Sequence, residues 1–254
     1  MANDLVTYLC KDHIAWVTLN RPEARNALSQ AVRDQLREAF QRFAEEDDAR
    51  VMVLSGAGDV FCAGGDLKEM AQMELKVPGP DFVPYLNRTI HTDKPAIAMV
   101  QGGAYAGGFL LAQMCDLVIA EEGAKFAITE ARWGRGAPWA APLPWLIPPR
   151  VAMELLLTAA PIDAARAREV GLVNRVVPAE ALREETEKLA ASIARNAPLS
   201  VRAGKAMVYA TLGADFMGGL AHGERFFEKA YLSEDAQEGP RAFRERRDPV
   251  WKGR

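Results

Sequence analysis

Two glycine-rich turns, each preceded by a run with the character of a buried strand, constrain the fold of this chain more than any other feature. The first occupies residues 61–68 (FCAGGDLK) after the apolar run 51–54, and the second occupies residues 102–108 (GGAYAGG) after the run 96–100. Glycine adopts backbone conformations that other residues avoid and lets a ligand approach the main chain. Two main-chain N–H groups that converge on one oxygen would stabilise an oxyanion, although glycines in such turns can also serve tight packing alone.

Charge and composition exclude several classes of function. The 254 residues carry a net charge of −3, so no basic field attracts nucleic acid or an anionic membrane. No apolar run reaches the ~18 residues that a membrane helix needs, and we see no signal peptide at the N-terminus. The three cysteines are odd in number and widely spaced, which argues against a disulfide framework or a metal knuckle. We therefore expect a cytoplasmic protein with no metal, membrane or nucleic-acid partner.

The expected elements place an α/β part before a helical part. Ser29 is suited to cap a helix with Val32, Leu36, Phe40 and Phe43 on one face. Apolar runs predict strands over 13–19, 51–54, 96–100, 117–120 and 126–128.

From residue 151 the apolar periodicity is mostly helical, with only 172–177 extended. We therefore divide the chain into a core over residues 1–195 and a helical C-terminal region over residues 196–254. The apolar stripes of that region would pack either on a neighbouring subunit or on the chain's own core, and the pattern favours neither.

Glu130 is the carboxylate best placed for chemistry, because it follows the strand at 126–128 and has apolar and aromatic neighbours. Such surroundings raise the pKa of a carboxyl group and suit it to general acid/base catalysis. The alternative is a surface glutamate paired with Arg132. Trp133, Trp139 and Trp145 would line an apolar pocket or, equally, belong to a core or interface.

Taken together, these motifs resemble those of the crotonase superfamily, which includes enoyl-CoA hydratases and isomerases. The resemblance runs nearly end to end and is carried by LNRP at 19–22, NAL at 26–28, FCAGGDLK at 61–68, KPAIA at 94–98, Gly107 and Gly108, MCD at 114–116, AKF at 124–126, Glu130, GLV at 171–173 and PVWKGR at 249–254.

The resemblance implies a spiral of ββα units with a helical C-terminal trimerisation region, in a homotrimer or a dimer of trimers. It implies an acyl-CoA thioester substrate, with coenzyme A entering as part of that substrate and no separate cofactor. The thioester oxygen would lie between the N–H groups of Gly65 and Gly107, with Glu130 as the catalytic acid/base. The implied substrate-binding residues are Glu23, Ala24, Arg25, Ala27, Ala63, Gly64, Asp66, Leu67, Lys68, Gly108, Leu110, Trp133 and Gly134.

One departure from the family pattern bears on the reaction. Hydratases of the family carry two glutamates that hold water, and the position of the first is occupied here by Leu110, while the second matches Glu130. A single carboxylate suits an enoyl-CoA isomerase, and it also suits relatives that hydrate and cleave hydroxycinnamoyl-CoA, which share the pattern Glu-x-x-Trp-Gly. We therefore expect an enzyme of the enoyl-CoA hydratase/isomerase type. A hydratase-lyase and a non-catalytic CoA-thioester binding protein are the alternatives.

Overall fold

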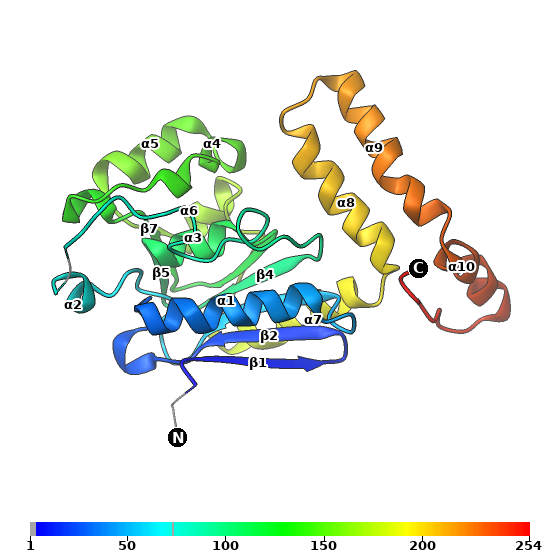
Figure 1. Ribbon diagram of the computed structural model, residues 1–254, viewed down its shortest axis with the longest axis horizontal. Helices are drawn as coiled ribbons and strands as arrows, with labels where there is room; N and C mark the ends of the chain where they lie inside the picture. Colours follow the sequence, from blue (N-terminus) through cyan, green and yellow to red (C-terminus); the bar gives the residue numbers. More distant parts are fainter. Residues whose placement is uncertain (1–3, 73) are drawn as a thin grey trace.

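The computed structural model describes residues 4–72 and 74–254, and its centre is a six-stranded sheet in the order β1-β2-β3-β4-β6-β9. β1 and β2 form an antiparallel hairpin, whereas the other neighbouring strands of this sheet are parallel. β5, β7 and β8 form a smaller second sheet, so the expected α/β class is confirmed (Figure 1). The strands are β1 (Val6–Lys11), β2 (Ile14–Leu19), β3 (Val51–Gly56), β4 (Ala96–Val100), β5 (Gly103–Tyr105), β6 (Leu117–Glu121), β7 (Lys125–Ala127), β8 (Ile162–Asp163) and β9 (Arg175–Val177).

Helices cover both faces of the large sheet and form the C-terminal part of the chain (Figure 1). The α-helices are α1 (Gln30–Glu45), α2 (Leu67–Met70), α3 (Gly107–Gln113), α4 (Leu143–Leu146), α5 (Pro149–Thr158), α6 (Ala164–Glu169), α7 (Leu182–Ala194), α8 (Pro198–Thr211), α9 (Phe216–Tyr231) and α10 (Glu234–Glu245). Short 3₁₀ turns are η1 (Pro22–Ala24), η2 (Glu130–Trp133), η3 (Pro138–Ala140) and η4 (Ala179–Ala181).

α1 forms where the sequence predicts a helix, and its apolar stripe fixes it on the sheet. The Ser29 hydroxyl accepts a hydrogen bond from the main-chain N–H of Val32, which satisfies one of the free donors of the first turn. Phe40 and Phe43 are fully buried on the stripe, and burial of each such side chain contributes about 1.5–3 kcal/mol before the entropy of ordering is counted.

The parallel strands are apolar along their whole length because the sheet is buried on both faces. One face, with Val17, Met52 and Ala98, belongs to the core cluster that includes α1 and α3. The opposite face, with Trp16 and Val53, packs against α7. The continuous apolar runs that predicted these strands therefore have a tertiary cause.

Two strands differ from the sequence-based expectation. β1 was not predicted, because it lies at the sheet edge and alternates between half-buried and exposed residues. Residues 103–105, expected to belong to a glycine turn, form β5 and pair in parallel with β7. In both cases pairing with another segment, rather than local periodicity, makes the strand.

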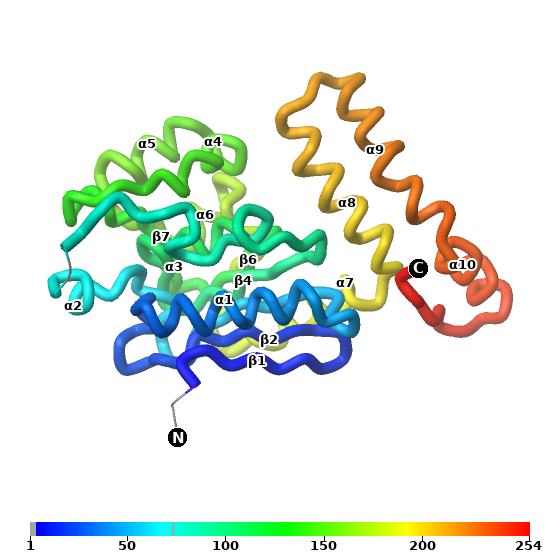
Figure 2. Tube along the Cα trace, in the orientation of Figure 1, coloured from blue at the N-terminus to red at the C-terminus, as the bar shows by residue number. Residues whose placement is uncertain are grey.

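The C-terminal helices extend away from the sheet-containing part of the molecule, with α8 and α9 packed as a hairpin and α10 beyond it (Figure 2). Asp116 connects the middle and the last turn of α8 to the start of β6, because its carboxylate lies 2.9 Å from Lys205 Nζ and accepts a hydrogen bond of 2.9 Å from the Tyr209 hydroxyl. The division of the chain at residue 195 stays a prediction. Within residues 4–72 and 74–254, none of the helices is both long and apolar enough to cross a membrane.

Candidate active site

The two glycine-rich turns lie against each other in the structure. An ideal Cβ on Gly64 would lie 3.3 Å from the nitrogen of Gly107, and one on Gly107 would lie 3.7 Å from the Cα of Gly64. Gly64 also has a φ of 92°, which side-chain-bearing residues rarely adopt. The chain therefore needs glycine here both for backbone conformation and for the close approach of the two turns.

The turns leave two main-chain N–H groups beside one cavity. Gly65 lies next to Leu28 in an isolated β-bridge, and Gly107 is the first residue of α3. Within the described part of the chain, neither N–H donates a hydrogen bond to a protein acceptor. Both glycines are among the residues that line the cavity.

The cavity has a volume of about 370 Å³ and is enclosed by segments far apart in the sequence. Its walls come from the two turns, α2, residues 78–88, η2 and η3, and most of the side chains are apolar or aromatic. The lining residues are Leu28, Ala63, Gly65, Leu67, Met70, Pro78, Gly79, Pro80, Phe82, Val83, Tyr85, Arg88, Ala106, Gly107, Leu110, Thr129, Glu130, Trp133, Arg135, Gly136, Pro138 and Trp139.

Glu130 is the first residue of η2 and lines this cavity. One oxygen, Oε1, accepts a hydrogen bond of 3.2 Å from the indole nitrogen of Trp139. The other, Oε2, is buried and has no hydrogen-bond partner within the described residues. Burial raises the pKa of the Glu130 carboxyl above its ordinary value, although a main-chain hydrogen bond of Glu130 itself and, to a smaller extent, the Trp139 bond oppose that rise. Of the two alternatives considered for Glu130, the structure therefore has the cavity carboxylate and not a surface pair with Arg132.

Trp139 is itself held in place on two sides. Its ring centroid lies 5.9 Å from that of Phe109, and its carbonyl accepts a hydrogen bond of 3.1 Å from the side-chain amide of Gln113. Both partners lie on α3, the helix that begins at Gly107. The helix that begins at the cavity-lining Gly107 thus also supports the residue that contacts Glu130.

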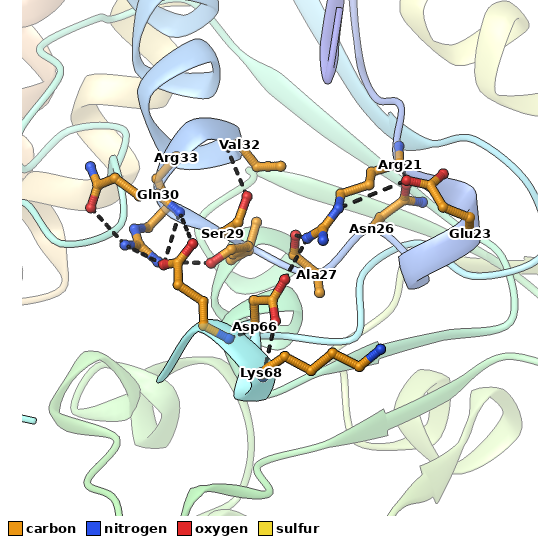
Figure 3. A network of polar contacts seen from close by, with 12 residues as sticks. Arg21, Glu23, Asn26, Ala27, Ser29, Gln30, Val32, Arg33, Asp66 and Lys68 are labelled. Atoms are coloured by element: carbon orange, nitrogen blue, oxygen red, sulfur yellow. Dashed lines mark hydrogen bonds and ion pairs between the residues drawn. The ribbon is translucent and has the colours of Figure 1, made fainter. Parts of the chain in front are cut away.

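A polar network joins two segments that contain expected substrate-binding residues, one near position 25 and one near position 66 (Figure 3). Arg21 Nη1 lies 2.6 Å from Asp66 Oδ2, while Oδ1 of Asp66 accepts hydrogen bonds from the main-chain N–H groups of Lys68 and Glu69. The guanidinium of Arg21 therefore holds the pKa of Asp66 below its ordinary value. The main-chain N–H of Ala63 donates to the carbonyl of Arg25 at 3.0 Å, which fixes the two segments side by side.

The structure brings some of the expected site residues to the cavity and leaves others outside it. Trp133 lines the cavity although its side chain is 58% exposed, whereas Trp145 is 66% exposed and lies outside. Gly64 and Gly108 serve the packing of the turns, since a Cβ on Gly108 would collide with the carbonyl of Cys62. Lining the cavity are Ala63, Gly65, Leu67, Gly107, Leu110, Glu130 and Trp133; outside it are Glu23, Ala24, Arg25, Ala27, Gly64, Asp66, Lys68, Gly108 and Gly134.

Sequence reasoning missed the wall formed by residues 78–88. The segment is irregular, but α1 holds it: Arg37 Nη1 lies 3.2 Å from Asp81 Oδ1, and the buried guanidinium of Arg33 lies 4.1 Å from the centre of the Phe82 ring. The aromatic residues after Pro80 were the available signal, but a loop pattern does not indicate where a segment packs. Arg135, in the irregular segment after η2, was missed for the same reason, and Met70 of α2 was missed because a short helix does not indicate which of its residues meets a cavity.

The side chains that could ligate a metal ion do not form a cluster in the described part of the chain. Across residues 4–72 and 74–254, no three His, Cys, Asp or Glu side chains are grouped so that they could hold a metal ion.

Comparison with known proteins gives consistent similarities over nearly the whole chain. Residues 10–254 match the sequence profile of the enoyl-CoA hydratase/isomerase family. A carnitinyl-CoA dehydratase of Citrobacter koseri is 38% identical over 249 residues, which is 94% of each chain. The corresponding protein of Salmonella typhimurium is 39% identical over 253 residues, again with 94% of each chain covered.

Solved structures agree with the sequence matches. A probable enoyl-CoA hydratase/isomerase from Mycobacterium abscessus superposes with a TM-score of 0.88 at 38% identity, covering all of both chains. An enoyl-CoA hydratase from Mycobacterium tuberculosis gives a TM-score of 0.89 at 35% identity, covering 99% of this chain and 100% of that one. The fold class expected from the resemblance is therefore confirmed.

Proposed function

The chain belongs to the enoyl-CoA hydratase/isomerase family and is an acyl-CoA enzyme of the crotonase type, and from this premise we propose that Glu130 is its acid/base residue. In the same proposal, the N–H groups of Gly65 and Gly107 stabilise the oxygen of the substrate thioester. The single observation that carries the proposal is the buried, unpartnered Oε2 of Glu130 in the cavity that both glycines line.

The chemistry follows from this arrangement. Removal of a proton from a carbon next to the thioester carbonyl forms a C=C bond to the carbonyl carbon and places negative charge on the oxygen. Two N–H donors aimed at that oxygen stabilise the enolate, and loss of one such donor typically lowers the rate about 10²–10³-fold. The proton moves to Oε2 of Glu130 and can return to the same carbon or to another one.

The position of Leu110 favours proton transfer over the addition of water by two carboxylates. Leu110 is buried on α3 and lines the cavity, where Glu130 is the one carboxylate among the described lining residues. We therefore propose a double-bond isomerisation as the main reaction. Reversible hydration with one carboxylate, as in a hydratase-lyase, is the second candidate and is supported by the similarity to proteins named carnitinyl-CoA dehydratase.

Incubation with acyl-CoA thioesters in D₂O, followed by mass spectrometry, tests the proposal. The panel contains short 2-enoyl, 3-enoyl and aromatic enoyl thioesters, with Glu130→Gln as the control enzyme. A shifted double bond or deuterium at the α carbon supports isomerisation, and a gain of water supports hydration. A protein that binds these thioesters without exchange or turnover would instead be a CoA-thioester binding protein, and the proposal would be wrong.

We also propose that the C-terminal helices assemble the protein as a trimer or a dimer of trimers in the cytoplasm. Large apolar side chains along α9 and just beyond it are exposed in the single chain, including Phe216, Leu220, Tyr231 and Leu232, and exposed patches of this kind mark interfaces. The three cysteines are free thiols, as expected in a reducing compartment. Light scattering that gives the mass of one chain would contradict the assembly.

A further inference from the structure

Few charged side chains line the cavity, and the arginines among them outnumber the carboxylates. Within the described lining, the ionisable side chains are Tyr85, Arg88, Glu130 and Arg135, and the rest of the wall is mostly apolar. Two guanidinium groups therefore face one carboxylate in a protein whose net charge is −3. A cavity lined by one sign of charge between low-dielectric walls raises the local concentration of ligands of the opposite sign.

Arg135 is fixed relative to the candidate acid/base residue by the backbone of a single turn. Its main-chain N–H donates to the carbonyl of Glu130 at 3.0 Å, and Gly134 between them has a left-handed φ of 62°. Arg135 is half-buried and lines the cavity. Because Glu130 acts on the acyl carbons in the proposed function, Arg135 belongs to the acyl side of the cavity.

Arg88 approaches from a different wall, the segment 78–88. Its main-chain N–H donates to the carbonyl of Tyr85 at 3.2 Å within a tight turn. Burial raises the pKa of Tyr85, and the positive charge of Arg88 opposes that rise, which is consistent with a guanidinium close to this lining residue. Arg88 is exposed, whereas Arg135 is half-buried, and the two residues line the same cavity from two different segments.

Among the described residues, neither Arg88 nor Arg135 forms an ion pair with a carboxylate, although Glu130 lines the same cavity. Arg21 and Arg33, by contrast, lie 2.6 Å and 3.5 Å from the carboxylates of Asp66 and Glu69. A cation in a largely apolar cavity is more favourable once an anion enters, and a guanidinium matches the planar geometry of a carboxylate. We propose that the preferred acyl group carries a carboxylate at the end remote from the thioester, bound by Arg88 and Arg135. This inference rests on the proposed function.

Guanidinium groups also bind phosphate, so the phosphates of coenzyme A are the rival source of the anion. The turn shared by Arg135 and Glu130 favours the acyl carboxylate, because the nucleotide end lies far along the substrate from the reacting carbons. The two sources make different predictions, since every CoA thioester carries the same phosphates whereas only some carry a remote carboxylate.

Calorimetric titration with saturated thioesters tests the inference without requiring turnover. The probes are glutaryl-CoA, its methyl ester at the remote carboxyl, and butyryl-CoA. The proteins are the wild type, Arg88→Gln, Arg135→Gln and the control Arg132→Gln, which changes an exposed arginine of the same turn outside the cavity. We expect the wild type to bind glutaryl-CoA at least about tenfold more tightly than the ester, since a charge-assisted hydrogen bond is worth about that factor or more.

Each cavity variant should lower that preference about tenfold while leaving the affinities for the ester and butyryl-CoA within about twofold, and Arg132→Gln should change none of them. Equal wild-type affinity for glutaryl-CoA and its ester would overturn the inference. An equal loss of affinity for all three probes would assign the arginines to the CoA phosphates and overturn it as well. Binding of glutaryl-CoA with the expected preference, but without turnover of any enoyl-CoA, would refute the proposed function alone. A wild type that binds none of the three probes would refute both.

Discussion

The indole nitrogen of Trp139 lies 3.2 Å from Oε1 of Glu130, while Oε2 of the same carboxylate is buried without a partner in the described structure. The two oxygens therefore have different roles. Oε1 accepts a hydrogen bond from a donor that fixes the orientation of the carboxylate, and Oε2 is buried with no partner among the described residues of the cavity-lining Glu130. A residue that exchanges a proton with a substrate needs such a difference between its two oxygens.

Replacement of Trp139 by Phe should move the pH dependence of the reaction. The variant keeps the aromatic packing against Phe109 but removes the donor, so the ionised form of Glu130 becomes less stable and its pKa rises further. Because the base is the ionised form, the acidic limb of the kcat profile should shift to higher pH, and kcat at neutral pH should fall about tenfold. Trp133→Phe is the control, since Trp133 lines the cavity but does not contact Glu130 through a hydrogen bond. An acidic limb that stays in place in Trp139→Phe would contradict this role.

Glu130→Gln should lower activity and change how stability depends on pH. Burial raises the pKa of Glu130 in the folded state above the ordinary value of 4.5, so the folded state binds this proton more tightly than the unfolded state. The contribution is therefore present at low pH and is lost as the pH rises from 4.5 through the raised value. Urea unfolding across this window should show a loss of stability in the wild type that is absent in the variant, while turnover falls about 10²–10⁴-fold. Parallel stability curves would mean that the pKa is not raised.

Gly64→Ala should separate the two glycine turns. The new Cβ would lie 2.7 Å from the carbonyl oxygen of Tyr105 and from the Cβ of Ala106, at a φ of 92°. We expect a loss of about 1–3 kcal/mol in the free energy of unfolding, with a larger proportional loss of turnover because the donors of Gly65 and Gly107 move apart. Gly79→Ala is the matched control, since its Cβ would meet no atom within 4 Å. Full activity in Gly64→Ala would show that the spacing of the turns does not matter.

Asp66→Asn should destabilise the contact between the segments near positions 25 and 66. Asp66 is 9% exposed and pairs with Arg21 at 2.6 Å, so the loss should be about 1–3 kcal/mol at neutral pH. Because the pairing lowers the pKa of Asp66 below 3.8, its contribution is fully present above that value and disappears as the pH falls through the lowered pKa. Unfolding measured from pH 7 down through the acidic range below 3.8, as far as the fold persists, checks both points. Glu23→Gln is the control and should lower the free energy of unfolding by less than about 0.5 kcal/mol, because exposed ion pairs contribute little. An equal loss in both variants would argue against a special role for Asp66.

The periodicity of the sequence predicted the parts of the fold in which local pattern and burial agree. The stripe of Val32, Leu36, Phe40 and Phe43 predicts α1, and the apolar runs predict β3, β4 and β6, because a sheet covered on both faces selects apolar residues at every position. The same reasoning identified the two glycine turns and Glu130, because their residue types stand out directly after predicted strands.

Two strands were not predicted from such patterns. β1 pairs with β2 at the sheet edge and is only partly buried, and β5, which pairs with β7, is a run of three residues with too little periodicity to be distinguished from a turn. Residues 78–88 have no regular structure, so nothing in their order of residues indicates that α1 holds them over the cavity through Arg33 and Arg37.

By itself the sequence determined which residue types are available for chemistry, namely glycine donors, one carboxylate and several aromatic side chains. Only the tertiary structure decided which of them meet. Trp139 and not Arg132 contacts Glu130, Gly64 lies against Gly107, and Arg88 and Arg135 share a cavity. The physical reason is that periodicity records only how a segment is buried. A site depends instead on the directions of side chains from several segments, and the separation of those segments in sequence does not indicate their distance in space.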